Sequence, residues 1–308
     1  MRYGIIEGRL GQPAEARFGR AREIGFDAVE LSFHAEGFQT LPLWTQEGAA
    51  RVRKLAAEAG VAVKSVCATY FNHYPFASPD AAERERCVEV LRRLIDTSAT
   101  AGLRTILLPF FGVAELTTAA DRELAATMVG RCARQAAAAG VRLGIEATLP
   151  VAHLRAIAAL AGQDAPGAVG VYYDVGNVCP AGYDAEADLA ALGAPSARGL
   201  GYGEGGQPGG SAAGPGPQAP SAGAELGPGP QGLLVGVHIK DRTRSGENVQ
   251  LGQGDVDFAA VARGLRAAGY DGYLVLETPG PPPGMDAQAA NAANLAYIRR
   301  WVEAGAGR

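Results

Sequence analysis

GVHIKDR, residues 236–242, follows an apolar run and places His238 near the end of what reads as a buried strand. A histidine in such a position is either a core residue with satisfied hydrogen bonds or a ligand. Three other apolar runs favour the ligand interpretation, because each ends in one acidic residue: VRLGIE at Glu146, GVYYD at Asp174 and GYLVLE at Glu277. The pattern therefore predicts one metal site whose ligands come from four separate strand ends.

Strand and helix patterns alternate along the whole chain in eight strand-then-helix units. The predicted strands are Tyr3–Glu7, Ala28–Leu31, Val61–Val66, Arg104–Leu108, Val141–Ile145, Val169–Tyr173, Leu233–Ile239 and Tyr273–Leu276. The predicted helices are Pro13–Ile24, Gln46–Ala59, Pro79–Ala101, Ala119–Ala139, Val151–Ala161, Ala185–Leu192, Val256–Ala268 and Asp286–Ala304. Most strands are continuous apolar runs, as buried parallel strands are. Eight such units in 308 residues predict an α/β fold, a (β/α)8 TIM barrel that forms a single domain over residues 1–308.

A doubly wound open sheet is the rival fold. It normally has fewer units and a Gly-rich first turn, and the early glycines Gly4 and Gly8 do not form a GxGxxG motif.

Residues 193–232 interrupt this rhythm with 40 residues, of which 14 are Gly and 7 are Pro. Such a composition buries too little apolar surface to offset the entropy of ordering the chain. We expect a disordered, low-complexity insertion between the sixth helix and the seventh strand. Because such αβ connections lie at the amino-terminal end of a barrel, we expect that the insertion can be removed without loss of chemistry.

The overall composition excludes several classes of protein. Hydrophobic residues make up 47% of the chain, enough for a large core, and the net charge of −4 argues against a nucleic-acid partner. No long uncharged apolar stretch predicts a membrane span, and the start of the chain does not resemble a signal peptide. The four cysteines are far apart and are typical of reduced thiols in a cytoplasmic protein.

The carboxyl ends of parallel barrel strands meet at one mouth of the barrel, so Glu146, Asp174, His238 and Glu277 are expected to converge there. Three carboxylates and one imidazole suit one divalent ion such as Mn²⁺, Mg²⁺ or Co²⁺, and Zn²⁺ also fits. Glu146 and Glu277 come from the two ends of the four-strand arc and are expected to face each other across the ion.

Two opposed glutamates suggest a proton transfer next to a ketose carbonyl that the metal polarises. One glutamate would remove the α-proton to form an enediolate, and the other would return a proton. Return to the opposite face of the same carbon gives epimerisation, whereas return to the adjacent carbon gives aldose–ketose isomerisation. The residues do not separate these two outcomes.

Several motifs resemble the sugar phosphate isomerase/epimerase superfamily with the xylose isomerase-like TIM barrel: GIIEGRL (4–10), GFDAVEL (25–31), GIE (144–146), DVGN (174–177), VHIKDR (237–242), LGQGDVDF (251–258) and GYDGYLVLET (269–278). The start, DVGN and HIKDR are most similar to the branch of ketose-phosphate 3-epimerases and hexulose-phosphate isomerases. The resemblance implies that Glu146, Asp174, His238 and Glu277 bind the metal and that the two glutamates transfer the proton. Many relatives have histidine where this chain has Asn177, which can still hydrogen-bond a substrate hydroxyl.

The expected small-molecule partner is a sugar or sugar phosphate, and further polar residues are candidate contacts for it: Glu7, Arg9, His34, Asn177, Lys240, Arg242 and Arg244. The last three could bind a phosphate or a sugar oxygen. Glu30 either points into the same mouth or forms a structural ion pair. An aromatic loop at residues 70–76 is either a lid over the sugar or ordinary core packing.

Three other functions are compatible with parts of this pattern. An endonuclease IV-type barrel with three zinc ions needs more than the four histidines of this chain and a basic groove. A lyase similar to inosose dehydratase would use the same metal site, and a non-catalytic sugar-binding barrel would not need two opposed glutamates. The sequence leaves the sugar, its phosphorylation, the native metal and a homodimer open.

Overall fold

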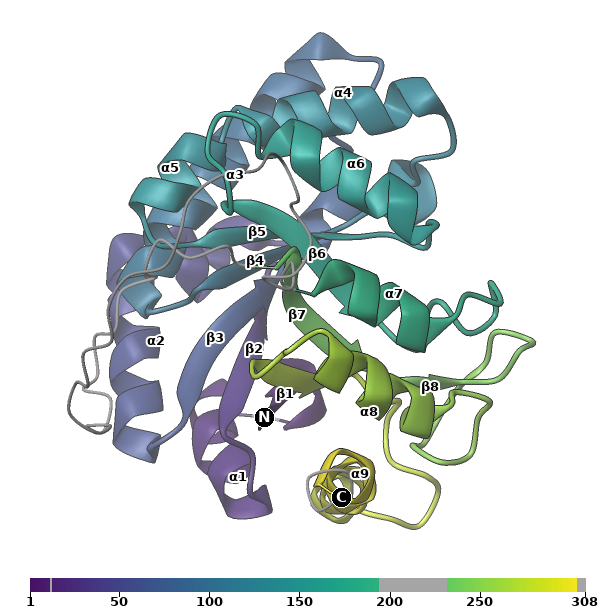
Figure 1. The fold of residues 1–308 in the computed structure, drawn as a ribbon. Helices are drawn as coiled ribbons and strands as arrows, with labels where there is room; N and C mark the ends of the chain where they lie inside the picture. The colour runs from purple at the N-terminus through teal and green to yellow at the C-terminus, as the bar shows by residue number, and fades with distance from the viewer. Residues whose placement is uncertain (12, 194–231, 304–308) are drawn as a thin grey trace, which may run out of the picture.

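The computed structural model describes residues 1–11, 13–193 and 232–303. Eight parallel strands close into a barrel in the order β1-β10-β7-β6-β5-β4-β3-β2, and helices surround it (Figure 1). The predicted (β/α)8 barrel is confirmed.

The barrel strands are β1 (Arg2–Ile6), β2 (Ala28–Ser32), β3 (Ala62–Cys67), β4 (Thr105–Pro109), β5 (Arg142–Glu146), β6 (Val169–Asp174), β7 (Leu234–Ile239) and β10 (Tyr273–Leu276). A short antiparallel pair, β8 (Asp241–Arg242) and β9 (Asn248–Val249), follows β7. The described helices are α1 (Arg17–Ile24), α2 (Gln46–Ala59), α3 (Ala81–Ala101), α4 (Ala119–Gly130), α5 (Ala133–Ala138), α6 (Val151–Ala161), α7 (Ala185–Leu192), α8 (Phe258–Ala267) and α9 (Ala287–Glu303).

Four predicted helices differ from the structure by two residues or more, and two of them, α1 and α8, begin later than predicted, at Arg17 and at Phe258. The predicted helix 119–139 is interrupted after Gly130, a weak helix former, and is divided into α4 and α5. The predicted start at Pro79 is also wrong, because α3 begins at Ala81 and its N-cap is Asp80, whose carboxylate accepts the Ala82 N–H at 2.9 Å.

The strands are apolar because they are covered on both faces. Every residue of β6 is buried, with the two tyrosines of VYYD on opposite sides of the sheet. Tyr173 donates its hydroxyl hydrogen to Asp188 of α7, at 2.9 Å, on the helical side. Tyr172 lies inside the barrel, beside His238, with 4.7 Å between the ring centroids. Strand alternation therefore places a large polar aromatic ring in the barrel interior.

Asp241 fixes the loop that follows β7. Its carboxylate is fully buried and accepts the N–H groups of Gly252, Gly254 and Val256. These bonds hold residues 250–256 against the end of β7, and α8 begins directly after them. The negative charge of Asp241 is therefore stabilised by hydrogen bonds within this loop.

The predicted insertion falls between α7 and β7, and residues 194–231 lie outside the described part of the chain. Its described ends, Gly193 and Gly232, line one cavity of about 480 Å³ together with Arg2 and Arg142, the first residues of β1 and β5. Both described ends therefore lie at the amino-terminal mouth of the barrel.

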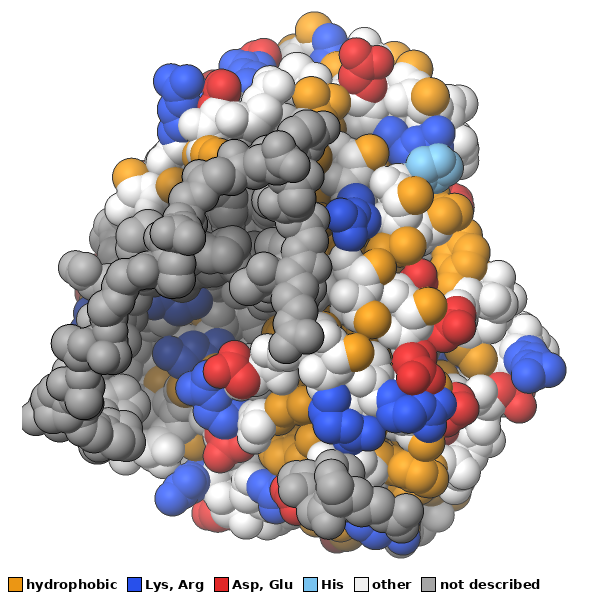
Figure 2. Space-filling view, in the orientation of Figure 1, with side chains coloured by type: hydrophobic (Ala, Val, Ile, Leu, Met, Phe, Trp, Pro, Cys, Tyr) orange, Lys and Arg blue, Asp and Glu red, His pale blue; other side chains and the backbone are white. Residues whose placement is uncertain are grey.

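The face of the molecule in Figure 2 carries mixed basic and acidic side chains, and its described residues form no continuous basic surface there. Among residues 1–11, 13–193 and 232–303, no helix has the length and apolar character needed to cross a membrane.

We expect the Gly236→Ala substitution to destabilise the barrel. A methyl group on Gly236 would lie 2.3 Å from Cε2 of Tyr172, so the ring must move. Overpacking of this kind costs about 1–3 kcal/mol, which urea denaturation would measure as a lower free energy of unfolding. Gly19→Ala in α1 is the matched control, because its methyl group meets nothing within 4 Å. A free energy of unfolding unchanged by Gly236→Ala would mean that Tyr172 is not confined.

We also expect that a short Gly/Ser linker can replace residues 194–231. Because Gly193 and Gly232, which flank this segment, lie at the amino-terminal mouth, the variant should keep the thermal unfolding midpoint and divalent-metal affinity of the full chain. Differential scanning fluorimetry and metal titration would check this. A loss of metal affinity in a folded deletion variant would contradict it.

Candidate metal centre

Four neighbouring strands deliver Glu146, Asp174, His238 and Glu277 to the carboxyl-terminal mouth of the barrel. Glu146 and Asp174 are the last residues of β5 and β6, His238 is the penultimate residue of β7, and Glu277 directly follows β10. The β6–β7 register pairs Asp174 with His238. The Glu277 N–H donates to the Ile239 carbonyl at 3.0 Å, which continues the β10–β7 pairing. These four residues are called the carboxylate–histidine cluster below.

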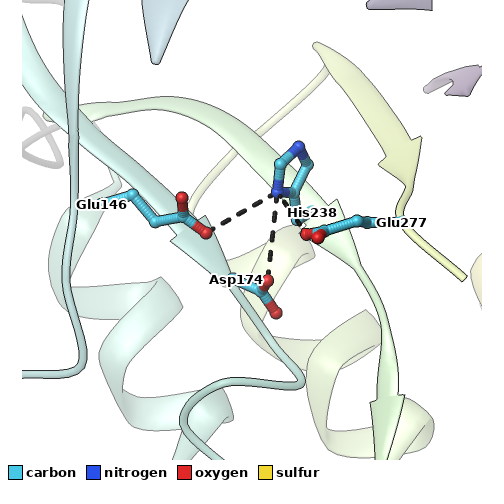
Figure 3. Close-up of side chains that lie close together, drawn as sticks. All are labelled: Glu146, Asp174, His238 and Glu277. Carbon is cyan, nitrogen blue, oxygen red and sulfur yellow. Dashed lines mark ion pairs between the residues drawn. The ribbon is translucent and has the colours of Figure 1, made fainter. Parts of the chain in front are cut away.

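One potential ligand atom from each residue of the cluster lies within 4.8 Å of those from the others. His238 Nδ1 is 3.1 Å from Glu277 Oε2, 3.7 Å from Glu146 Oε1 and 3.9 Å from Asp174 Oδ2. Figure 3 shows Glu146 and Glu277 approaching the imidazole from opposite sides, with Asp174 between them. The expected convergence of the four side chains is therefore observed.

Burial and mutual charge shift the protonation of the cluster. Glu146 is only 5% exposed, and burial raises its pKa to about 7, although His238 acts in the opposite direction. Burial alone lowers the pKa of His238, but Glu30, Glu146 and Glu277 outweigh it and raise that pKa well above its usual range. Without another cation, the cluster therefore holds protons near neutral pH.

Lys240 is a second cation beside the cluster. Its ammonium is buried, 2.9 Å from Glu277 Oε2 and 3.0 Å from Asp174 Oδ2. Burial raises the pKa of Glu277, but His238 and Lys240 together lower it well below its usual range. The two opposed glutamates thus have different environments, since Glu277 contacts the ammonium and Glu146 does not.

Backbone bonds orient Asp174 for ligation. Its Oδ1 accepts the N–H groups of Gly176 and Asn177, at 2.8 and 3.0 Å, in the turn that follows β6. Its Oδ2 is directed toward the cluster. An added methyl group on Gly176 would lie 2.8 Å from Lys240, so glycine permits this close approach.

The residues of the cluster fit a divalent metal ion. Asp174 Oδ2 and His238 Nδ1 are buried and make no hydrogen bond within the described chain, although each faces the other ligand atoms. Their nearest polar neighbours are charged groups, the Lys240 ammonium at 3.0 Å from Asp174 Oδ2 and Glu277 Oε2 at 3.1 Å from His238 Nδ1, so a divalent ion could replace these ion pairs. Three carboxylates and an imidazole suit harder divalent ions. The cluster could therefore hold one such ion, while its identity stays a prediction.

The other predicted substrate residues divide into two groups. Asn177 and Arg242 lie beside the cluster, because Asn177 Nδ2 is 3.5 Å from Glu146 Oε1 and Arg242 donates to Asn177 Oδ1 at 3.1 Å. Lys240 belongs to this group through its ion pairs. Within the described chain, no hydrogen bond or ion pair joins the cluster to the second group, which comprises Glu7, Arg9, His34 and Arg244. A substrate role stays a prediction for both groups.

Glu7 has structural contacts: it accepts a bond from Arg17 at 2.8 Å and the Ser32 N–H at 2.7 Å. His34 and Arg244 are exposed. In the aromatic loop, Tyr70, Phe71 and Phe76 are almost completely buried, which favours core packing over a lid.

The contact between Glu30 and His238 was not predicted from the sequence. Glu30 Oε1 lies 2.7 Å from His238 Nε2 inside the barrel, on the side of the ring away from the cluster. The sequence feature that could have pointed to this contact is an acidic residue in the middle of an apolar strand, because a buried charge needs a partner. Of the two alternatives given for Glu30, the buried pairing is the one observed, with His238 as its partner.

We expect divalent-metal affinity to rise with pH between about pH 6 and 8. The metal must displace a proton from Glu146, whose pKa is raised to about 7, and each displaced proton changes the affinity by about tenfold per pH unit. Isothermal titration with Mn²⁺ in buffers of different ionisation enthalpy would measure both affinity and proton release. Glu146→Gln should weaken binding and make the pH dependence less steep, because only the proton of His238 then remains to be displaced, whereas Asp164→Asn, at an exposed ion pair, should leave it unchanged. A pH-independent wild-type affinity would contradict this assignment.

Comparison with known proteins identifies the family. The family model described as "Xylose isomerase-like TIM barrel" matches residues 18–301. L-ribulose-5-phosphate 3-epimerase UlaE from Salmonella heidelberg (strain SL476) is 27% identical, with 98% of this chain and 93% of that protein covered. The protein of the same name from Escherichia coli (strain ATCC 8739) is 26% identical with the same coverage.

Solved structures share the fold, among them two 3-epimerases. A structure of L-ribulose 3-epimerase has a TM-score of 0.70 and 19% identity and covers 99% of this chain and 95% of its own. A crystal structure of D-psicose 3-epimerase in the presence of D-fructose has a TM-score of 0.71 and 16% identity and covers 98% of this chain and 99% of its own. With the family match over most of its length, the chain belongs to the xylose isomerase-like TIM barrel family.

Proposed function

We propose that this protein is a divalent-metal-dependent 3-epimerase of a ketose or ketose phosphate. The observation that carries the proposal is the pair of glutamates, Glu146 and Glu277, on opposite sides of one candidate metal site. The names of the full-length relatives, which are 26–27% identical, support the reaction class. The native metal is expected to be Mn²⁺, Mg²⁺ or Co²⁺, and Zn²⁺ also fits the ligands.

The reaction assigned to the glutamates is a proton exchange without net redox change. One carboxylate removes the hydrogen from the carbon next to the ketone, and the C–H electron pair forms the enediolate. The other glutamate, as the carboxylic acid, returns a proton to the opposite face, and the configuration of that carbon is inverted. When bound, the metal supplies a Lewis acid for the developing negative charge on the carbonyl oxygen.

The position of Lys240 supports the assignment of different roles, base and acid, to the two glutamates. Its ammonium, 2.9 Å from Glu277, keeps that residue ionised, so we assign Glu277 as the base. Glu146 has no such cation and its pKa is raised to about 7 in the metal-free protein, so it is the glutamate that would more readily take up a proton, here from a substrate hydroxyl, and return it to carbon. A base and an acid would thus face the substrate from opposite sides. In the reverse reaction the two glutamates exchange these roles.

A phosphorylated ketose is the substrate class that we favour. Arg242 is half-buried and is joined to Glu146 through the Asn177 amide, so a cation lies one side chain away from the cluster. A guanidinium binds phosphate through paired hydrogen bonds. The relatives of similar sequence carry names of pentose phosphate epimerases, which supports the same choice.

The proposal predicts that Glu277→Gln abolishes proton exchange at the substrate carbon. Loss of one general base typically costs about 10²–10⁴-fold in rate. The metal-loaded protein in D2O would be given L-ribulose 5-phosphate, L-ribulose and D-psicose, and NMR would follow deuterium at carbon 3. Wild type should incorporate deuterium and form the epimer, while Glu277→Gln should still bind metal and ketose weakly.

Glu247→Gln is the control, because this exposed glutamate lies on the loop after β7 outside the cluster. Unchanged deuterium incorporation in Glu277→Gln would remove the acid–base assignment. Loss of water from the substrate would indicate a lyase, and binding without exchange in the wild type would indicate a sugar-binding barrel.

A further inference from the structure

Glu30 is a fully buried carboxylate that the proposed proton transfer does not use. It lies on β2, inside the barrel, and both of its oxygens have partners. Oε1 is 2.7 Å from His238 Nε2, and Oε2 accepts the hydroxyl hydrogens of Ser65 at 2.6 Å and Tyr172 at 2.8 Å. Ser65, on β3, and Tyr172, on β6, hold the carboxylate from two other strands. These four residues are called the Glu30 network.

The Glu30 network determines which nitrogen of His238 faces the cluster. A carboxylate only accepts hydrogen bonds, so the Nε2 atom that faces Glu30 must carry a hydrogen. In the neutral ring, Nδ1 then has its lone pair free, and it is Nδ1 that faces Glu146, Asp174 and Glu277. A metal-binding histidine needs this arrangement, with one nitrogen fixed by an acceptor and the other available to the metal.

Tyr172 fixes the network in two ways. Its hydroxyl donates to Glu30, and its ring packs edge-on against the imidazole of His238, with 63° between the ring planes. Gly236 leaves the space that this ring occupies. The imidazole is therefore held at Nε2 and on one face, which leaves Nδ1 directed into the cluster.

We propose that Glu30 is a positioning residue for the metal centre, which fixes the tautomer and orientation of His238 without touching metal or substrate. The inference rests on the proposed function only for the statement that the cluster binds a divalent ion. It adds a deeper carboxylate, on a fifth strand, to the machinery of the site.

The first test compares Glu30→Leu with Glu30→Gln. Leucine removes the acceptor, and we expect Mn²⁺ affinity to fall about 10- to 100-fold in isothermal titration, as is typical when the outer partner of a metal ligand is changed. Glutamine keeps an oxygen for the Nε2 hydrogen, and its amide can donate to the Ser65 and Tyr172 hydroxyls. We therefore expect this variant to recover most of the lost affinity.

Histidine ¹⁵N NMR of the Zn²⁺-loaded protein supplies a readout that a merely structural residue would not change. Wild type and Glu30→Gln should show His238 with hydrogen on Nε2, whereas Glu30→Leu should lose this single tautomer. If Glu30→Leu does not fold, Glu30→Asp takes its place, because the shorter side chain withdraws the acceptor but keeps the charge. Tyr172→Phe and Ser65→Ala leave the Nε2 contact in place and should lower Mn²⁺ affinity less than tenfold. The matched control is Tyr173→Phe, which removes a buried hydroxyl bond to Asp188 outside the Glu30 network and should leave Mn²⁺ affinity unchanged.

Wild-type Mn²⁺ affinity in a folded Glu30→Leu or Glu30→Asp variant would overturn the proposal, even if that variant were less stable to urea. A different set of results is expected if only the proposed epimerase function is wrong. Wild-type protein would then bind Mn²⁺ without exchanging ketose protons, while the affinity difference between the Glu30 variants would persist. Metal binding unaffected by both Asp174→Asn and Glu30→Leu would place the metal elsewhere and would refute both proposals.

Discussion

Negative charge buried in a closed barrel is the constraint on which this structure depends. Glu30, Glu146, Asp174 and Glu277 lie within the same barrel end, and Lys240 and His238 are the cations in contact with them among the described residues. Carboxylates in such surroundings are stable only when paired with positive charge or hydrogen-bond donors. Protons bound to the cluster neutralise part of this negative charge, and a divalent ion would neutralise more of it. The turn after β6 donates two N–H groups to Asp174, and Gly176 leaves space for Lys240 to approach. Both features stabilise this buried negative charge.

The barrel and the convergence of four side chains could be predicted from the sequence because both follow from periodic features. Continuous apolar runs mark buried strands, and the parallel barrel brings the ends of those strands to one mouth. An acid or histidine at such an end is therefore placed by topology alone. The break after Gly130 and the cap at Asp80 depend on local geometry, which propensities specify only weakly.

The Glu30 network could not be predicted because its members are far apart in sequence. Glu30 and His238 are 208 residues apart, and their contact depends on the shape of the barrel interior. Asp241 follows His238 in the same motif, but its carboxylate accepts hydrogen bonds from three backbone N–H groups of the following loop. A motif fixes the position of a residue along a strand, whereas the direction of its side chain depends on neighbours that the motif does not contain. The two solved structures lead to the same conclusion. Proteins that are only 16–19% identical to this chain share its barrel, but a shared barrel does not by itself assign a reaction.

The amino-terminal mouth of a TIM barrel is usually regarded as a purely stabilising face. Here Ser65 and Tyr172, the two hydroxyls that hold Glu30, also line the cavity at that mouth. The two ends of the barrel are thus connected by one side-chain layer. Protein engineering that redesigns the lower end for robustness alone would also alter the electrostatic support of the upper end, so the two properties cannot be optimised independently in this scaffold.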